Sequence, residues 1–143
     1  MIERNEAMPA GSVLPWLEVL HHLPFNSEGL LPAVARQYDS GEVLMLAWMN
    51  RAAIEETLAA GRVCYWSRSR RRLWRKGETS GQVQHLKELR LDCDGDTVLL
   101  LVDQQGPACH TGRRSCFYNA VRGRQVEVIS DPLIDPQTLY PNQ

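Results

Sequence analysis

The chain has 143 residues, of which 43% are hydrophobic and 23% charged, and its formal net charge is −1. A chain of this length can bury one core without disulfides, and its near-neutral charge gives no electrostatic case for nucleic-acid or membrane binding. We find no signal-peptide pattern and no apolar run near the roughly 20 residues that span a bilayer, so we expect a cytoplasmic protein.

The first part of the chain predicts a lead-in followed by a β-hairpin. Residues 1–12 have the composition of a loose N-terminal segment, and we assign residues 13–143 to one folded domain. Residues 30–50 contain two apolar runs that meet at Asp39-Ser40-Gly41, which is typical of a hairpin turn.

A helix, a strand and a polar loop are expected next. Asn50 is a suitable N-cap for a helix over 51–60, and Gly61 would end it. Residues 63–69 are rich in β-branched and aromatic side chains and predict a strand. The basic, glycine-punctuated residues 68–81 predict a functional loop.

The remaining sequence predicts further strands. Residues 85–104 alternate between apolar and polar side chains before a second apolar run, which indicates two strands. Residues 125–130 predict a last short strand, and the proline-containing tail 131–143 should cross the surface. We therefore predict an α+β fold: one compact domain of mainly antiparallel strands with one or two helices.

An acidic triplet is the first candidate metal site. Asp92, Asp94 and Asp96 have the spacing i, i+2, i+4, so their carboxylates would leave one face of an extended strand. Such a cluster suits a hard cation such as Mg²⁺. The alternatives are a solvated acidic turn and an EF-hand loop, but the EF-hand requires glycine where this chain has Thr97.

Three of the four cysteines form a candidate zinc site. In a reducing cytosol, clustered cysteines are more often metal ligands or catalytic groups than disulfides, although an even number also permits two disulfides. Cys93, Cys109 and Cys116 would give Zn²⁺ three sulfur ligands and leave its fourth position open, as in a catalytic site. Cys93 would lie on the strand face opposite the aspartates, or be a small core residue. Cys64 is assigned to packing.

Polar and basic side chains around these cysteines suggest an anionic substrate. His110 is adjacent to Cys109, which makes it awkward as a fourth ligand but suitable as a proton carrier. Residues 68–76 are mostly arginine and lysine, which fits a solvated face, a nucleic-acid patch with Trp74 for stacking, or a phosphate site. The candidate phosphate and ribose contacts are Arg68, Arg70, Lys76, Thr79, Ser80, Arg113 and Arg114.

Long motifs in series then identify a family. The segments "YWSRSRRRLWRKGETSG", "RLDCDGD" and "ACHTGRRSCFY", together with the hairpin "GLLPAVARQYDSGEVLMLAWMN", resemble the phosphoribosyl-AMP cyclohydrolases of histidine biosynthesis. The resemblance extends over about residues 29 to 122. It implies hydrolysis of the adenine ring of 1-(5-phosphoribosyl)-AMP between N1 and C6, giving the ring-opened aminoimidazole carboxamide ribotide in the third step of the pathway.

The resemblance also implies the cofactors and the assembly. Zn²⁺ would be held by the three cysteines named above and Mg²⁺ by the three aspartates, in an intertwined homodimer that shares its zinc site between subunits. Zinc would activate a water for attack on C6, and His110 is the candidate for moving the proton. The residues after Tyr118 are too few for the phosphoribosyl-ATP pyrophosphohydrolase domain that some relatives carry fused to this one.

Two other functions are weighed against this one. A zinc-dependent purine deaminase would carry an H-x-E signature, which the sequence lacks. A non-catalytic, zinc-stabilised RNA-binding module would use the basic run 68–76, but the net charge and the acidic triplet argue against it.

Overall fold

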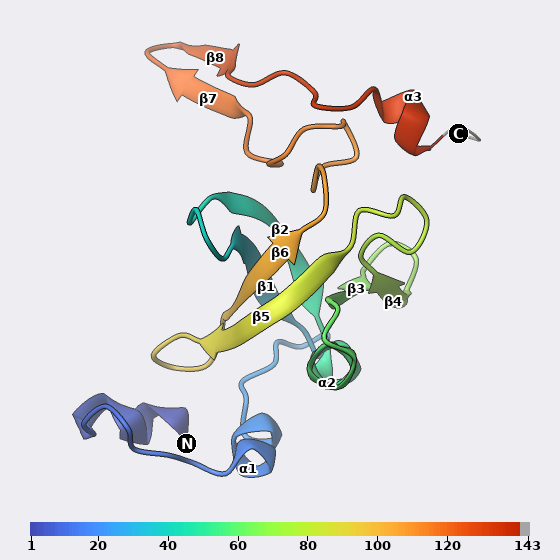
Figure 1. Ribbon diagram of the computed structural model, residues 1–143. Coiled ribbons are helices and arrows are strands. Elements are labelled where there is room, and N and C mark those ends of the chain that lie inside the picture. Colours follow the sequence, from blue (N-terminus) through green and yellow to red (C-terminus); the bar gives the residue numbers. More distant parts are fainter. Residues whose placement is uncertain (141–143) are drawn as a thin grey trace.

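The computed structural model describes residues 1–140, which form a curled six-stranded sheet, a separate two-stranded hairpin and short helices (Figure 1). In chain order the elements are the 3-10 helix η1 (Ile2–Ala7), α1 (Trp16–His21), β1 (Leu31–Gln37), β2 (Val43–Met49), α2 (Arg51–Ala60), β3 (Cys64–Ser67), β4 (Arg72–Arg75), β5 (Gln84–Leu91), β6 (Val98–Gln104), β7 (Asn119–Arg122), β8 (Gln125–Val128) and α3 (Pro136–Leu139). The α+β class and the mainly antiparallel pairing are confirmed.

The predicted β1–β2 hairpin is confirmed, and it lies at the centre of the sheet. The strand order is β4-β3-β2-β1-β6-β5. Every pair is antiparallel except β1 with β6, which run parallel with Ala35 opposite Leu100. The sequence did not reveal this parallel contact, because it joins strands that are far apart along the chain.

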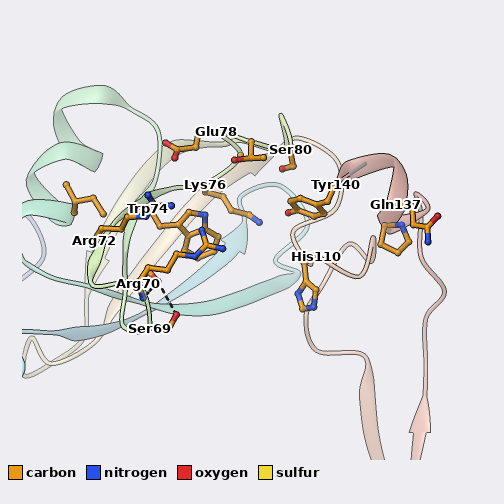
Figure 2. A pocket seen from close by; sticks show the side chains of 15 residues that line it. Ser69, Arg70, Arg72, Trp74, Lys76, Glu78, Ser80, His110, Gln137 and Tyr140 are labelled. Atoms are coloured by element: carbon orange, nitrogen blue, oxygen red, sulfur yellow. Dashed lines mark hydrogen bonds between the residues drawn. The ribbon is translucent and has the colours of Figure 1, made fainter. Parts of the chain in front are cut away.

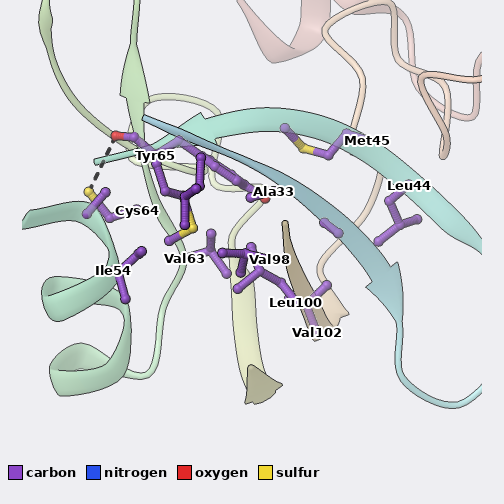
Figure 3. Packing of buried hydrophobic residues seen from close by; sticks show 14 of the residues in the cluster. Ala33, Leu44, Met45, Ile54, Val63, Cys64, Tyr65, Val98, Leu100 and Val102 are labelled. Atoms are coloured by element: carbon purple, nitrogen blue, oxygen red, sulfur yellow. Dashed lines mark hydrogen bonds between the residues drawn. The ribbon is translucent and has the colours of Figure 1, made fainter. Parts of the chain in front are cut away.

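The core lies on one face of this sheet, because buried and partly exposed residues alternate along β1 and β6. Side chains such as Ala33, Leu100 and Val102 pack there against Ile54 of α2 and against Tyr65 of β3 (Figure 3). Cys64 is fully buried in this cluster, which confirms its packing role.

Helix α2 begins and ends where the sequence predicts. The Asn50 side chain accepts a hydrogen bond from the Ala53 amide at 2.8 Å, and Gly61 adopts the left-handed conformation with φ 71°. The buried Thr57 hydroxyl accepts from the Cys64 amide at 2.9 Å, so it ties α2 to β3.

Two predictions about local structure are wrong. Residues 68–81 are not a single loop, because β3 and β4 form a hairpin inside the basic run and Arg71 takes a positive φ of 54° in its turn. Cys93 does not lie on a strand face opposite the aspartates. Residues 92–97 instead form the turn between β5 and β6, where Asp92 Oδ1 accepts hydrogen bonds from the Asp96 and Thr97 amides at 3.0 and 3.3 Å.

The two ends of the chain carry structure that the sequence did not indicate. The N-terminal segment contains η1, and Ile2 packs beside Gly95 of the acidic turn. The strand over 125–130 is confirmed as β8, with β7 as its partner, and this hairpin stands apart from the main sheet (Figure 1). The predicted surface tail contains α3, and its last residues, 141–143, lie outside the described residues.

Among residues 1–140, no helix has the length and apolar character needed to cross a membrane.

Candidate active site

A braced loop after β6 brings two of the candidate sulfur ligands together. The Cys109 amide donates to the Arg113 carbonyl at 3.0 Å, so the loop folds back on itself. The Cys116 amide donates to the Leu44 carbonyl of β2 at 2.7 Å, which fixes the end of the loop on the central sheet. Gly112 makes the turn with φ 84°, a conformation that favours glycine. We call residues 108–116 the sulfur loop.

The thiols of Cys109 and Cys116 lie next to each other in a partly desolvated environment. Burial and the adjacent Cys109 thiol together raise the pKa of Cys116 to about 12. Thr111 donates a hydrogen bond to Cys109 Sγ at 3.1 Å. Two thiolates cannot coexist here without a cation, and sulfur is the ligand that Zn²⁺ accepts readily, so the donor set fits zinc.

The positively charged side chain of Lys76 lies next to the Cys109 and Cys116 thiols. Its side chain is buried, with 6% of the residue exposed, and its ammonium donates to the Ala108 carbonyl at 2.6 Å. Burial lowers the pKa of Lys76, and the nearby thiols of Cys116 and Cys109 oppose that shift. The lysine therefore joins the end of β4 to the sulfur loop.

The acidic turn gathers the second candidate donor set. One carboxylate oxygen from each of Asp92, Asp94 and Asp96 lies within 4.8 Å of the others. The carboxylates of Asp92 and Asp94 raise the pKa of Asp96, as expected for crowded like charges. All-oxygen ligands at this spacing fit Mg²⁺. The three carboxylates therefore lie close together, as their spacing predicts, although a turn rather than a strand brings them together.

Cys93 belongs to the acidic turn and not to the sulfur loop of the same chain. It is exposed in the turn that precedes β6, whereas Cys109 follows the other end of that strand. The seven residues of β6 extend roughly 20 Å. Within residues 1–140 the acidic triplet is the one group of three or more potential ligands that comes close together. One copy of the chain therefore does not assemble the three predicted zinc ligands.

A cavity of about 580 Å³ opens beside the sulfur loop (Figure 2). His110 lines it from that loop, and Arg70, Lys76, Thr79 and Ser80 line it from the β3–β4 hairpin and the turn that follows. The structure thus brings together one predicted proton carrier and four predicted substrate contacts. The volume is within the range of pockets that bind small molecules.

The other three predicted substrate contacts lie outside this cavity and have their own partners. The Arg68 guanidinium stacks 4.7 Å from the Trp48 ring centroid. Arg113 donates to the Ser130 carbonyl at 2.7 Å, and Arg114 forms an ion pair with Glu42 at 3.1 Å. Their role as substrate contacts stays a prediction.

Sequence reasoning missed several residues of the cavity wall. Arg72 was not among the predicted contacts, and Trp74 was named only as a stacking residue of a nucleic-acid patch. Both belong to β4, which ends directly before Lys76, so recognising this strand in the basic run would have placed them at the site. Pro136, Gln137 and Tyr140 come from the C-terminal segment, and no local pattern indicates that they return to the site.

Comparison with known proteins decides the family. A family model described as phosphoribosyl-AMP cyclohydrolase matches residues 45–118, which is slightly more than half of the chain. The phosphoribosyl-AMP cyclohydrolase of Halorhodospira halophila is 72% identical over 98% of this chain and 99% of its own length. The chain belongs to the phosphoribosyl-AMP cyclohydrolase family.

Further relatives agree with this assignment. The phosphoribosyl-AMP cyclohydrolases of Alkalilimnicola ehrlichii and Alcanivorax borkumensis are 75% and 61% identical, over 85% and 98% of this chain. As a member of the cyclohydrolase family, the chain is an enzyme and a hydrolase. The basic run was the main argument for an RNA-binding module, but its side chains do not form one basic patch. Lys76 is buried, and Arg75 pairs with Glu56 at 2.7 Å.

Proposed function

We propose that this chain hydrolyses the N1–C6 bond of the adenine ring of 1-(5-phosphoribosyl)-AMP, in the histidine pathway and in the cytoplasm. One observation carries the proposal: His110 and the buried Lys76 line one cavity beside the sulfur loop, with Arg70, Thr79 and Ser80 on its wall. Four free thiols in the described chain agree with a reducing compartment.

Zinc would be held by Cys109 and Cys116 together with Cys93, and magnesium by Asp92, Asp94 and Asp96. When bound, the ions supply a water of lowered pKa and positive charge against the phosphates. The paired thiols and the crowded carboxylates described above support this assignment, because each set is costly to ionise without a cation.

The residues of the chain itself provide binding and proton transfer. In the hydrolysis the oxygen of water bonds to C6 and the N1–C6 bond breaks. Of the two protons of the water, one leaves the cationic ring for the solvent and one passes to N1. His110 is the exposed residue of the sulfur loop and lies at the cavity, where it can carry that proton. Arg70, Thr79 and Ser80 offer donors for phosphate oxygens, and we add Arg72 to this set. Lys76 holds the Ala108 carbonyl and offsets the charge of the sulfur pair.

We further propose that the zinc site is completed by a second copy of the chain in an intertwined homodimer. Cys93 and Cys109 lie beyond opposite ends of β6, so Cys93 of a second copy is the natural third ligand for each sulfur loop. The exposed apolar side chains Val121, Val126 and Val128 on the β7–β8 hairpin support association, because such a surface is usually covered.

Turnover of phosphoribosyl-AMP by the purified, zinc- and magnesium-supplemented protein tests the function, with absorbance following the opening of the purine. We expect Cys109→Ala to lose both turnover and bound zinc. Cys64→Ala is the matched control, since Cys64 is buried in the core away from the cavity, and it should retain both. Absence of turnover in the parent protein, or full turnover by Cys109→Ala, would contradict the proposal.

A further inference from the structure

The C-terminal segment of the chain returns to the sulfur loop and is fastened there. Leu133 and Ile134 donate their amides to the Gly112 carbonyl at 2.8 and 3.4 Å. A Cβ at position 112 would overlap the Ile134 carbonyl, so the close approach requires glycine. Arg113 adds a hydrogen bond to the Ser130 carbonyl at 2.7 Å. Residues 130–140, which we call the C-terminal strap, are thus tied to the loop that carries His110.

The end of the strap forms part of the cavity wall. Pro136, Gln137 and Tyr140 line the cavity together with His110, and Leu139 between them is buried, with 8% of the residue exposed. Figure 2 shows the Tyr140 ring beside His110 and turned toward the space that the Lys76 side chain enters. The strap lies outside residues 45–118, the part of the chain that the family model matches.

A second aromatic side chain lines the same cavity from the sheet. Trp74 of β4 packs against Tyr65, with the ring centroids 5.4 Å apart, and Lys76 Nζ lies 5.5 Å from its ring. These contacts fix the position of the indole, and the Lys76 ammonium lies over its ring. Figure 2 shows Trp74 and Tyr140 on opposite sides of the Lys76 ammonium, one on the β3–β4 hairpin and the other on the strap.

We propose that the C-terminal strap supplies a substrate-binding wall, in which Tyr140 stacks on the purine ring. This inference rests on the proposed function, since it names the residues that hold the base of that substrate. A planar base gains stacking on the Tyr140 ring, while the arginines and hydroxyls that line the cavity bind the phosphates. Tyr140 holds the base in the cavity, so it acts in binding and not in proton transfer.

Steady-state kinetics of Tyr140→Ala and Tyr140→Phe test whether Tyr140 binds the substrate. Since stacking acts equally on bound substrate and transition state, we expect Tyr140→Ala to raise KM about tenfold with little change in kcat. Tyr140→Phe keeps the aromatic face and should keep the KM of the parent. Tyr38→Ala is the matched control, because Tyr38 is an exposed tyrosine that does not line the cavity. Zinc content and the thermal unfolding midpoint are recorded for each variant.

Calorimetric binding of AMP separates this inference from the proposed function. We expect Tyr140→Ala to bind AMP about tenfold more weakly than the parent and Tyr140→Phe to bind it equally well. If the parent turns over phosphoribosyl-AMP but Tyr140→Ala keeps the KM of the parent, Tyr140 does not bind the substrate, and the proposed function is unaffected. If the parent lacks turnover, the proposed function is wrong, and the AMP affinities still show whether Tyr140 binds the base. A loss of kcat instead of a rise in KM would also overturn the inference about Tyr140.

Discussion

A chain of hydrogen bonds between buried side-chain amides joins the core to both sides of the cavity. The loss of free energy of unfolding when this chain is broken can be calculated. Tyr65 donates its hydroxyl to Gln84 Oε1 at 2.7 Å, and Gln84 Nε2 donates to Gln104 Oε1 at 2.9 Å. Gln104 Nε2 then donates to the carbonyls of Gln82 and Gln105 at 3.1 and 3.0 Å. Those two residues begin the segments that lead back to Lys76 and forward to the sulfur loop.

The substitution Gln84→Met keeps most of the side-chain volume and removes both the acceptor and the donor of the amide. It leaves two buried groups without partners, the Tyr65 hydroxyl and Gln104 Oε1, in a place where Tyr65 and Gln84 are 0% exposed. Each orphaned group costs about 1.5 kcal/mol, so we expect the free energy of unfolding to fall by about 3 kcal/mol.

Adding Tyr65→Phe provides the decisive comparison. In the parent protein this change should cost about 1.5 kcal/mol, because it leaves the buried Gln84 Oε1 without its donor. In the Gln84→Met background it removes a hydroxyl that is already unpaired, so the double variant should be more stable than Gln84→Met alone by about 1 kcal/mol. Urea unfolding at one fixed protein concentration measures all four proteins. Additive losses, or a loss below about 1 kcal/mol for Gln84→Met, would refute the network as the source of stability.

Three smaller predictions follow from single contacts. Asn50→Ala should lower the free energy of unfolding by about 1 kcal/mol, measured by urea unfolding, because the Ala53 amide loses its cap; an unchanged midpoint would contradict it. In metal-free protein, a thiol reagent at pH 8 should label the exposed Cys93 and spare Cys64, whose pKa burial raises to about 12; equal labelling, read by peptide mass, would disprove this. The hydrogen bond from Arg75 lowers the pKa of Glu56 below its ordinary 4.5, so its stabilisation is present above pH 4.5 and lost as the pH falls through the folded-state value. Thermal unfolding across this acid range should therefore be less pH-dependent in Glu56→Gln than in the parent, and identical slopes would count against the pair.

Local signals in the sequence predicted local structure well. Gly41, Asn50 and Gly61 each mark a position whose backbone conformation or side-chain acceptor is decided by its immediate neighbours. The hairpin and the helix between these positions therefore follow from the sequence. The acidic triplet was grouped correctly for the same reason, since three aspartates within five positions stay close in a strand or in a turn.

Contacts between distant segments were not predictable from these patterns. The parallel pairing of β1 with β6 depends on how the whole sheet is assembled, and the approach of Tyr140 to His110 depends on a segment that first forms the β7–β8 hairpin. Strand β4 was missed because basic residues flank Leu73 and Trp74 on both sides, and this run of charge hides the strand. The candidate metal ligands were conspicuous in the sequence, but the cavity wall formed by the C-terminal strap could be found only from the fold.

Mixing two inactive variants tests most directly the central claim, a hydrolytic centre built from two copies of the chain. Cys93→Ala and Cys109→Ala should each be inactive alone. When they are unfolded together in equal amounts and refolded with zinc and magnesium, half of the dimers contain one copy of each variant. Every such dimer has one intact site, so the account predicts about a quarter of the parent turnover of phosphoribosyl-AMP. Turnover that stays at the level of the separate variants would contradict a centre shared between copies.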